Sequence, residues 1–220
     1  MPLRLVGERG DKAYESRIYF DGEMHVRPGL WHDLFNLLAW LAYPETKAAL
    51  NERHCAPGEN DGAAADPPRA ARSRARDTLT LFDENGAICA ASDAALLGRV
   101  RDFEWKALFW GDRRRVVECM HVFTLGHALA EKALAPFVGM SAHAMLLEVA
   151  ADFARLPPAR QVGDVDRLAA QVVRGDGSFA TPQALAPLPV LGIPGWWADN
   201  TQEAFYENTA YFRPRRARRD

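Results

Sequence analysis

The first pattern of hydrophobic and polar positions is a pair of short strand-like runs, RIYF and EMHV, on either side of Asp21-Gly22. Asp-Gly between two such runs is a strong signal for a tight turn between paired strands. The pattern therefore predicts a β-hairpin over residues 17–27. Pro28 and Gly29 then end the second strand and separate it from the next segment.

The next segment, WHDLFNLLAWLAY, has the density of apolar residues that is typical of a helix and contains no β-branched run. It predicts a helix over residues 31–42. Pro44 ends this helix and opens a second one, PETKAALNER, because proline suits the first turn of a helix. Apolar side chains occur on nearly all sides of the first helix, and such a helix is normally buried. We therefore expect helix 31–42 to lie inside the core.

The middle of the chain gives mixed strand and helix signals. TLTLF and AICAA on either side of residues 83–86 predict a second hairpin, and a helix follows over 93–109. RVVECMHVF (115–123) is apolar and β-branched on both faces, which is typical of a central strand covered on two sides. HALAEKAL predicts a short amphipathic helix and DVDRLAAQVV a longer one, whereas AMLLEVAADF fits a strand or a helix.

These elements predict an α+β fold. A chain of 220 residues is within the range that one hydrophobic core can serve, and 48% of its residues are hydrophobic. We expect a single domain over 1–220, with a small, mostly antiparallel sheet built from hairpins and flanked by helices. A flexible insertion at 55–77 and a basic tail at 213–220 are expected outside the core. The Pro-rich, aromatic C-terminal segment at 176–212 is expected to wrap over the core.

Charge and cysteine content exclude several classes of protein. The 27 Lys and Arg residues nearly balance 29 Asp and Glu residues, so no global field attracts a nucleic-acid backbone. Contact with nucleic acid would need the local arginine runs at 69–76 and 213–219. Three cysteines without a CxxC pair are typical of reduced thiols, and no apolar run approaches the ~20 residues of a membrane span. With no leader pattern at the start, the expected location is the cytoplasm.

The first turns of helix 31–42 contain its only strongly polar residues, His32, Asp33 and Asn36. His32 and Asn36 share one face of the helix, and buried polar groups need partners. A catalytic interpretation makes the three residues the floor of a pocket, with His32 as a ligand or general base and Asp33 as the residue that orients it. The alternative is structural, because the same side chains can satisfy the helix start and the preceding hairpin.

A second candidate site lies in GHALAEKAL, where His127 and Glu131 are one helical turn apart and can bind a divalent metal together. A hydrogen bond between these two residues in a partly buried helix would explain the same spacing. Zinc needs at least three protein ligands, and the third would come from His25, His32, His54 or Glu118.

Two further polar pairs carry weaker signals. Asn51 and His54 share one face of the second helix, which a solvated surface explains as well as a site does. Glu118 and His121 lie on opposite faces of the predicted central strand, where a buried carboxylate must be neutral or paired, for example with an arginine at 113–115.

Four segments that are spread along most of the chain form a recognisable set: WHDLFNLLAWLAYPETKAALN, DTLTLFDENGAI, GHALAEKAL, and PGWW followed by FRP. Together they resemble a bacterial family catalogued as domain of unknown function 3025. The resemblance implies no activity, substrate or cofactor. Residues 55–77 match none of the family's segments and are expected to be an insertion particular to this protein.

Two kinds of function fit the sequence. We expect a non-catalytic binding or assembly protein, whose polar helix start and aromatic tail form the surface for a ligand or partner. A hairpin followed by a helix with His and Asn is loosely similar to the ββα-metal nucleases, but the spacing of a full nuclease motif is not met. No glycine-rich phosphate loop, GxSxG or HExxH motif occurs, and the substrate, cofactor and oligomeric state stay open. The alternative is a metal-assisted hydrolase in which five residues converge on one cleft: His32, Asp33, Asn36, His127 and Glu131.

Overall fold

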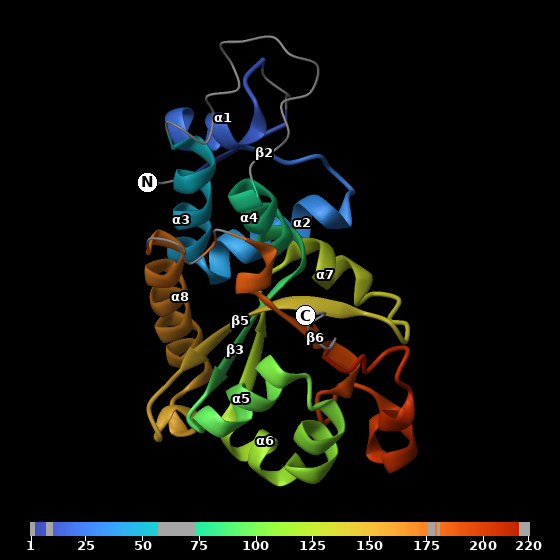
Figure 1. The fold of residues 1–220 in the computed structure, drawn as a ribbon. Helices are drawn as coiled ribbons and strands as arrows, with labels where there is room; N and C mark the ends of the chain where they lie inside the picture. Colours follow the sequence, from blue (N-terminus) through green and yellow to red (C-terminus); the bar gives the residue numbers. More distant parts are fainter. Residues whose placement is uncertain (1–2, 8–10, 57–73, 176–178, 180, 216–220) are drawn as a thin grey trace.

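The chain folds as a mixture of helices and strands, shown in Figure 1. The computed structural model describes residues 3–7, 11–56, 74–175, 179 and 181–215. Among these residues, no helix is both long and apolar enough to cross a membrane. In chain order the helices and strands are β1 (Arg4–Val6), α1 (Tyr14–Asp21), β2 (Glu23–His25), α2 (Trp31–Ala42), α3 (Pro44–Cys55), α4 (Arg74–Asn85), β3 (Gly86–Ala91), α5 (Ala94–Asp102), a π-helical turn (Ala107–Gly111), α6 (Arg113–Cys119), β4 (Met120–Thr124), α7 (His127–Lys132), β5 (Ser141–Glu148), α8 (Pro158–Arg174) and β6 (Ala186–Pro189).

The main sheet has four strands in the order β4-β3-β5-β6. β3 pairs in parallel with β5 and antiparallel with β4, while β5 pairs antiparallel with β6. Every residue of β3 is buried, with Ala87 and Cys89 in one apolar cluster and Ile88 and Ala90 in another. β3 is therefore the central strand that is covered on both faces.

The prediction of a central strand at 115–123 is wrong. The first part of this run is helix α6, and the N–H of Val116 donates to the carbonyl of Asp112 at 2.9 Å as helical hydrogen bonding continues from the π-helical turn. The second part is β4, which lies at the edge of the sheet. Val117 is exposed on α6. The apolar run therefore divides between a helix and a strand, and neither half has two buried faces.

Neither predicted hairpin is present. Residues 17–20, expected as the first strand, belong to α1, and Gly22 ends this helix in the left-handed conformation, with φ of 65°. Residues 23–25 do form a strand, β2, but it pairs in parallel with β1. The N–H of Gly22 donates to the carbonyls of Arg17 and Ile18. Asp21-Gly22 is thus the end of a helix. Glycine is as common at this position as it is in a hairpin turn.

At the second predicted hairpin, the expected first strand is part of helix α4, and this helix leads directly into a strand. α4 continues to Asn85, and β3 begins at Gly86. The threonines that suggested a strand lie in α4, where the packing of apolar residues such as Phe82 overrides the local preference of threonine. Residues 74–77, expected in the insertion at 55–77, begin α4, and residues 57–73 lie outside the described part of the chain.

The two faces of the sheet support separate apolar clusters. α3, α4 and α8 cover one face, where Leu50 and Phe82 are fully buried. α5, the π-helical turn and the C-terminal segment cover the other face (Figure 1). Tyr211 and Phe212 are buried there, and the hydroxyl of Tyr211 donates to the carbonyl of Met140 at 2.7 Å. The aromatic C-terminal segment therefore packs over the core, as the sequence predicts.

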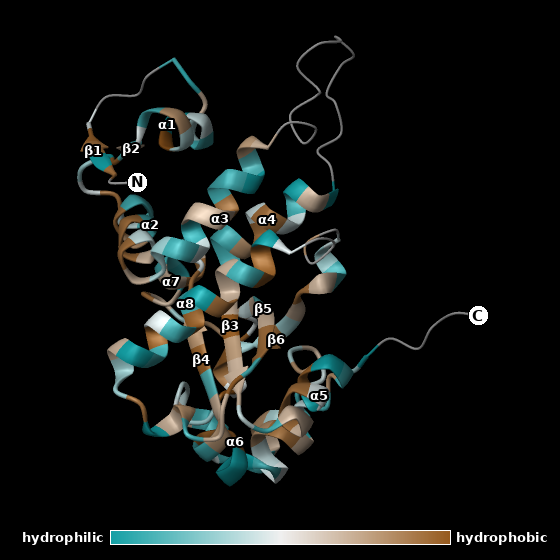
Figure 2. Cartoon of the chain, turned by 90° about the vertical axis from the view of Figure 1, so that its left-hand side faces the viewer, coloured by the Kyte–Doolittle hydropathy of each residue, from teal (hydrophilic) through white to brown (hydrophobic). Residues whose placement is uncertain are grey.

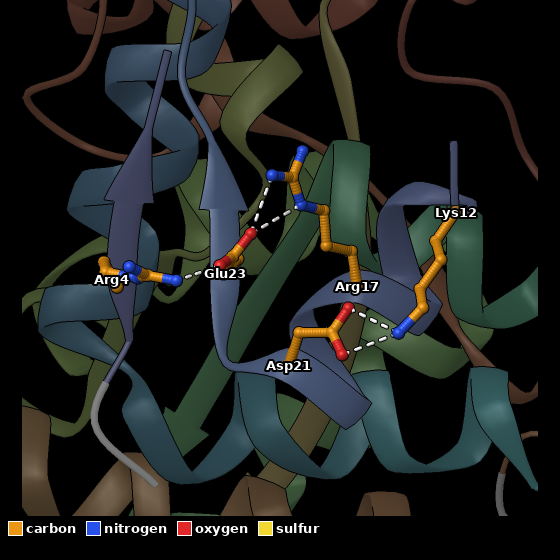
Figure 3. Close-up of polar contacts among 5 residues, drawn as sticks. All are labelled: Arg4, Lys12, Arg17, Asp21 and Glu23. Carbon is orange, nitrogen blue, oxygen red and sulfur yellow. Dashed lines mark hydrogen bonds and ion pairs between the residues drawn. The ribbon is translucent and has the colours of Figure 1, made fainter. Parts of the chain in front are cut away.

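The N-terminal segment forms a small unit of its own, drawn in Figure 3. β1 and β2 pair in parallel. Glu23 of β2 accepts hydrogen bonds from Arg4 and Arg17, and Lys12 forms an ion pair with Asp21 at 2.6 Å. These contacts fix α1 against β2, and both elements contribute to the pocket described below.

The C-terminal basic tail predicted at 213–220 is described only as far as residue 215. Arg215 forms an ion pair with Asp102 at 2.6 Å, and residues 216–220 lie outside the described part. Nucleic-acid contact through the arginine runs therefore stays a prediction.

The helix predicted over 31–42 is confirmed as α2, but its predicted burial is wrong. Its polar residues Asp33 and Asn36 are buried instead. Asp33 contacts the loop before α2, and Asn36 contacts α1 and α3. The usual arrangement of an amphipathic helix is thus inverted. The apolar side chains exposed on α2 are Trp31, Leu34, Leu38 and Leu41.

Candidate functional site

A pocket of about 340 Å³ lies where α1, α2, α3, α4 and α7 meet, on the side of the molecule away from α5 and α6. Its volume is in the range of small-molecule sites, but its wall is mostly polar rather than apolar. The residues that line it include His32, Asp33, Asn36, His54, Asp83 and His127.

α2 packs against α7, which brings three of the predicted site residues together. Nδ1 of His32 lies 3.0 Å from Oε2 of Glu131. The ring of His32 also meets the ring of His127 edge to face, with the centroids 4.4 Å apart. His32 and Glu131 are partly exposed, whereas His127 is buried. His32 and Glu131 thus form a histidine–carboxylate pair at the pocket, and the buried His127 packs against His32.

His127 begins α7 and is almost completely enclosed. Burial lowers the pKa of His127 to about 4, and the nearby Asp83 carboxylate offsets only part of this effect. The ring is therefore neutral at pH 7. Its Nδ1 lies 3.7 Å from Oδ2 of Asp83 and has no hydrogen-bond partner among the described residues. A buried polar atom without a partner is uncommon and favours a bound ligand or water at that position.

Asp33 has a structural role at the start of α2. Its carboxylate accepts hydrogen bonds from the backbone N–H of Arg27 at 2.7 Å and from the Arg27 guanidinium at 2.7 and 2.9 Å. The hydrogen bond to the Arg27 side chain is the main reason that the pKa of Asp33 is lowered to about 2. Asp33 therefore stays ionised and holds the preceding loop in place, and it forms no hydrogen bond to His32.

Asn36 joins a buried network around Lys47. Its side-chain oxygen accepts a hydrogen bond from Nζ of Lys47 at 3.0 Å, and its amide nitrogen donates to the hydroxyl of Tyr14 at 2.8 Å. Lys47 is only 4% exposed and also pairs with Asp83. Burial would raise the pKa of Asp83, but the Lys47 ammonium outweighs it and the pKa falls below its ordinary value.

The face of α3 that carries Asn51 and His54 is buried, so the interpretation as a solvated surface is wrong. The amide of Asn51 donates to the backbone carbonyl of Glu15 at 2.9 Å and to its carboxylate at 2.5 Å. Burial raises the pKa of Glu15, and the nearby Asp83 carboxylate adds to the effect. α1 and α3 thus bring a second carboxylate into the polar wall of the pocket.

Lys47 and Asp83 are site residues that the sequence analysis missed. Lys47, Asn51 and His54 are four and three positions apart, so their shared face on this helix was a usable signal. Asp83 gave no such signal, because it was assigned to the turn of a hairpin that does not exist.

Glu118 and His121 do not join the site, and their predicted placement on opposite faces of a central strand is wrong. Glu118 lies on α6, where it is largely exposed and pairs with Arg114 at 3.7 Å. His121 lies on β4, and burial lowers its pKa. Neither residue lines the pocket at α2 and α7.

In the part of the chain that the structure describes, no three His, Cys, Asp or Glu side chains are placed to share one metal ion. Glu131 is engaged by His32, and His127 faces Asp83. Metal binding by His127 and Glu131 therefore stays a prediction.

A comparison with protein families matches nearly the whole chain. The model of the family described as "Protein of unknown function (DUF3025)" matches residues 4–216, which confirms the resemblance inferred from the four sequence segments. No curated protein and no solved structure matches the chain.

Proposed function

Since the chain belongs to the DUF3025 family, whose description assigns no activity, we propose a function from the geometry of the site: an enzyme that performs acid–base chemistry on a small polar molecule. In this proposal His32 exchanges a proton with the bound molecule and Glu131 orients His32. His127 and Asp83 contact the molecule from the buried side of the pocket. Asp33 and Asn36, which the sequence suggested as catalytic, position the loop before α2 and the Lys47 network.

The hydrogen bond between His32 and Glu131 is the observation that carries the proposal. A carboxylate bonded to one ring nitrogen fixes the orientation of an imidazole and stabilises the charge that the ring gains with a proton. Glu131 engages Nδ1, which leaves Nε2 of His32 for a ligand. His32 lines the pocket and is partly exposed, so a ligand can reach it. Histidine suits this role because its ordinary pKa lies close to neutral pH.

The buried side of the pocket favours a ligand that carries a hydroxyl or amino group. Nδ1 of His127 and Oδ2 of Asp83 are 3.7 Å apart, too far for a direct hydrogen bond. A hydroxyl group between them would accept a hydrogen bond from the N–H of His127 and donate one to the Asp83 carboxylate. A protonated amino group would donate to the carboxylate and, in the other tautomer of the ring, to Nδ1 of His127. Such a contact would satisfy the unpartnered nitrogen of His127.

A cytoplasmic location in a bacterial cell is the second part of the proposal. Cys55, Cys89 and Cys119 are all free thiols. Cys89 is completely buried, and burial raises the pKa of its thiol to about 12, so it is unreactive. Free thiols are typical of proteins that work in a reducing compartment.

The test is incubation of the purified protein with a defined panel of small hydroxylated and amino compounds, followed by mass spectrometry. Wild-type protein should convert at least one compound. His32→Gln should slow the conversion by ~100-fold or more, which is the usual contribution of a general acid–base group. Glu131→Gln should slow it in the same direction, because a neutral amide stabilises the protonated ring less. Calorimetry should show that His32→Gln still binds the compound.

His143→Gln is the matched control, because His143 lies on β5 and does not line the pocket. This variant should keep the wild-type rate. A panel from which nothing is bound or converted, or a conversion that His32→Gln leaves unchanged, would contradict the proposal. Stoichiometric zinc or manganese that is lost in His127→Ala would favour the metal-assisted hydrolase instead.

A further inference from the structure

The exposed positions of α2 are all apolar. Trp31 is 56% exposed, Leu34 40%, Leu38 47% and Leu41 70%. The intervals between these residues are three, four and three positions, so they form one continuous stripe along the helix. The same spacing forms the seam by which two helices pack side by side. We call these four residues the α2 stripe.

The α2 stripe has no cover within the described part of the chain. Figure 2 shows α2 at the edge of the molecule and coloured as hydrophobic over most of its length. The polar residues of the helix, which would normally face water, point instead into the pocket and its network. The composition of α2 is therefore that of a buried helix, although one side of it faces solvent. A contiguous apolar surface of this kind is typical of an interaction site.

The apolar surface continues beside the stripe. Leu30, just before α2, is exposed. α7 packs against α2, and the segment directly after α7 exposes Leu134, Phe137 and Val138. The eight side chains are on average about half exposed; at ~200 Å² for a large apolar side chain, they offer on the order of 800 Å² per copy. That is about the area each partner contributes to a stable protein interface.

We propose that the α2 stripe is covered by the α2 stripe of a second copy of this chain, in a twofold dimer. A twofold interface brings the same surface of each copy together, so any exposed charge would tend to meet its own kind. No exposed position of α2 carries a charge, and the surface is therefore complementary to itself. A surface built for a different partner usually carries charged groups that select it. This proposal does not depend on the proposed chemistry of the pocket.

The test is the oligomeric state of the purified full chain over a wide range of concentrations, measured by analytical ultracentrifugation and light scattering. Wild-type protein should have twice the mass of one chain. Leu34→Glu combined with Leu38→Glu should weaken the dimer at least ~100-fold, because each copy loses two apolar contacts and places charges opposite each other. Leu38→Ala, which introduces no charge, should weaken it in the same direction by ~10-fold.

Phe20→Glu and Val117→Glu are matched controls, because both residues are highly exposed but lie on α1 and α6. Both controls should remain dimers, and circular dichroism should show that all variants are folded. A wild-type monomer at every concentration would overturn the proposal, as would dimers that the stripe variants leave unchanged. A wild-type monomer that sediments with phospholipid vesicles, together with stripe variants that do not, would show that a membrane surface covers the stripe instead.

Discussion

The ammonium group of Lys47 forms an ion pair with the carboxylate of Asp83 beneath the pocket, and only 4% of the Lys47 side chain is exposed. The pair joins α3 to α4 and stands next to His127, which lies 3.7 Å from the same carboxylate. The buried ammonium of Lys47 is tolerated here because the largely covered carboxylate of Asp83 compensates its charge. The stability of the fold and the electrostatics of the site therefore depend on the same contact.

Removal of one partner of this ion pair should be strongly destabilising. Asp83→Asn leaves the Lys47 ammonium buried without its counter-charge, and we expect a loss of about 3–5 kcal/mol in the free energy of unfolding. Urea denaturation followed by circular dichroism measures this change. Glu52→Gln is the control, because Glu52 pairs with Arg174 at the surface and should cost less than about 1 kcal/mol. Equal effects of the two substitutions would show that the Lys47 pair is not buried.

Asp33 should make the protein sensitive to acid below about pH 4. The hydrogen bond from the Arg27 side chain lowers the pKa of Asp33 to about 2, below its ordinary 3.8. The stabilisation is therefore complete above the ordinary value and is lost as the pH falls through about 2. Asp33→Asn should cost about 2 kcal/mol at neutral pH and flatten the pH dependence between 4 and 2. Urea denaturation across this range should show a smaller slope in the variant, and an unchanged slope would contradict the expectation.

His127 should give a pH dependence in a higher range. Burial lowers its pKa to about 4 in the folded protein, below the ordinary 6.5. The unfolded chain therefore takes up a proton first, so stability is complete above pH 6.5 and falls as the pH drops toward 4. His127→Gln should remove a slope of up to about 1.4 kcal/mol per pH unit in this window. NMR titration of the His127 ring gives a direct check, and a midpoint near 6.5 would show that the ring is not desolvated.

The helices on which the site is built were predictable because their signals are local. Pro44 divides α2 from α3 as expected, and the apolar density of α2 set both of its ends correctly. The helical turn between His127 and Glu131 was visible in the sequence, but their approach to His32 depends on how α7 packs against α2. A spacing within one helix predicts which residues share a face. It does not predict what that face meets.

Both hairpin predictions failed for the same physical reason. Asp21-Gly22 and Asn85-Gly86 each combine a turn-forming residue with glycine, and this combination ends a helix as well as it closes a hairpin. Packing favours the helix, since Phe82 of α4 is fully buried in the core. Asp83 was hidden by this error, since the site residue lies on the helix that the sequence pattern did not reveal.

The predicted burial of α2 failed for a different reason. Apolar residues on all sides of a helix indicate that it is covered, but the pattern does not say whether the cover belongs to the same chain. In the monomer, Asp33 and Asn36 face the protein and Leu38 and Leu41 face solvent. A dimer through the α2 stripe would reconcile the sequence pattern with this exposure.

Gly126 lies directly before His127 at the start of α7, where no larger residue fits. A Cβ at Gly126 would lie 2.4 Å from the backbone nitrogen of Gly86 and 2.5 Å from the carbonyl oxygen of Glu84, so the backbone would have to move. Gly126→Ala should therefore cost about 1–3 kcal/mol, the usual range for overpacking, and should displace His127, the next residue. Urea denaturation measures the loss of stability, and the NMR titration of His127 should shift toward its ordinary pKa as the ring becomes hydrated. Gly98→Ala, in α5 with nothing within 4 Å, should instead stabilise the protein by about 0.5–1 kcal/mol, because alanine favours a helix. If both substitutions stabilised the protein equally, the close approach of α7 to β3 would be wrong.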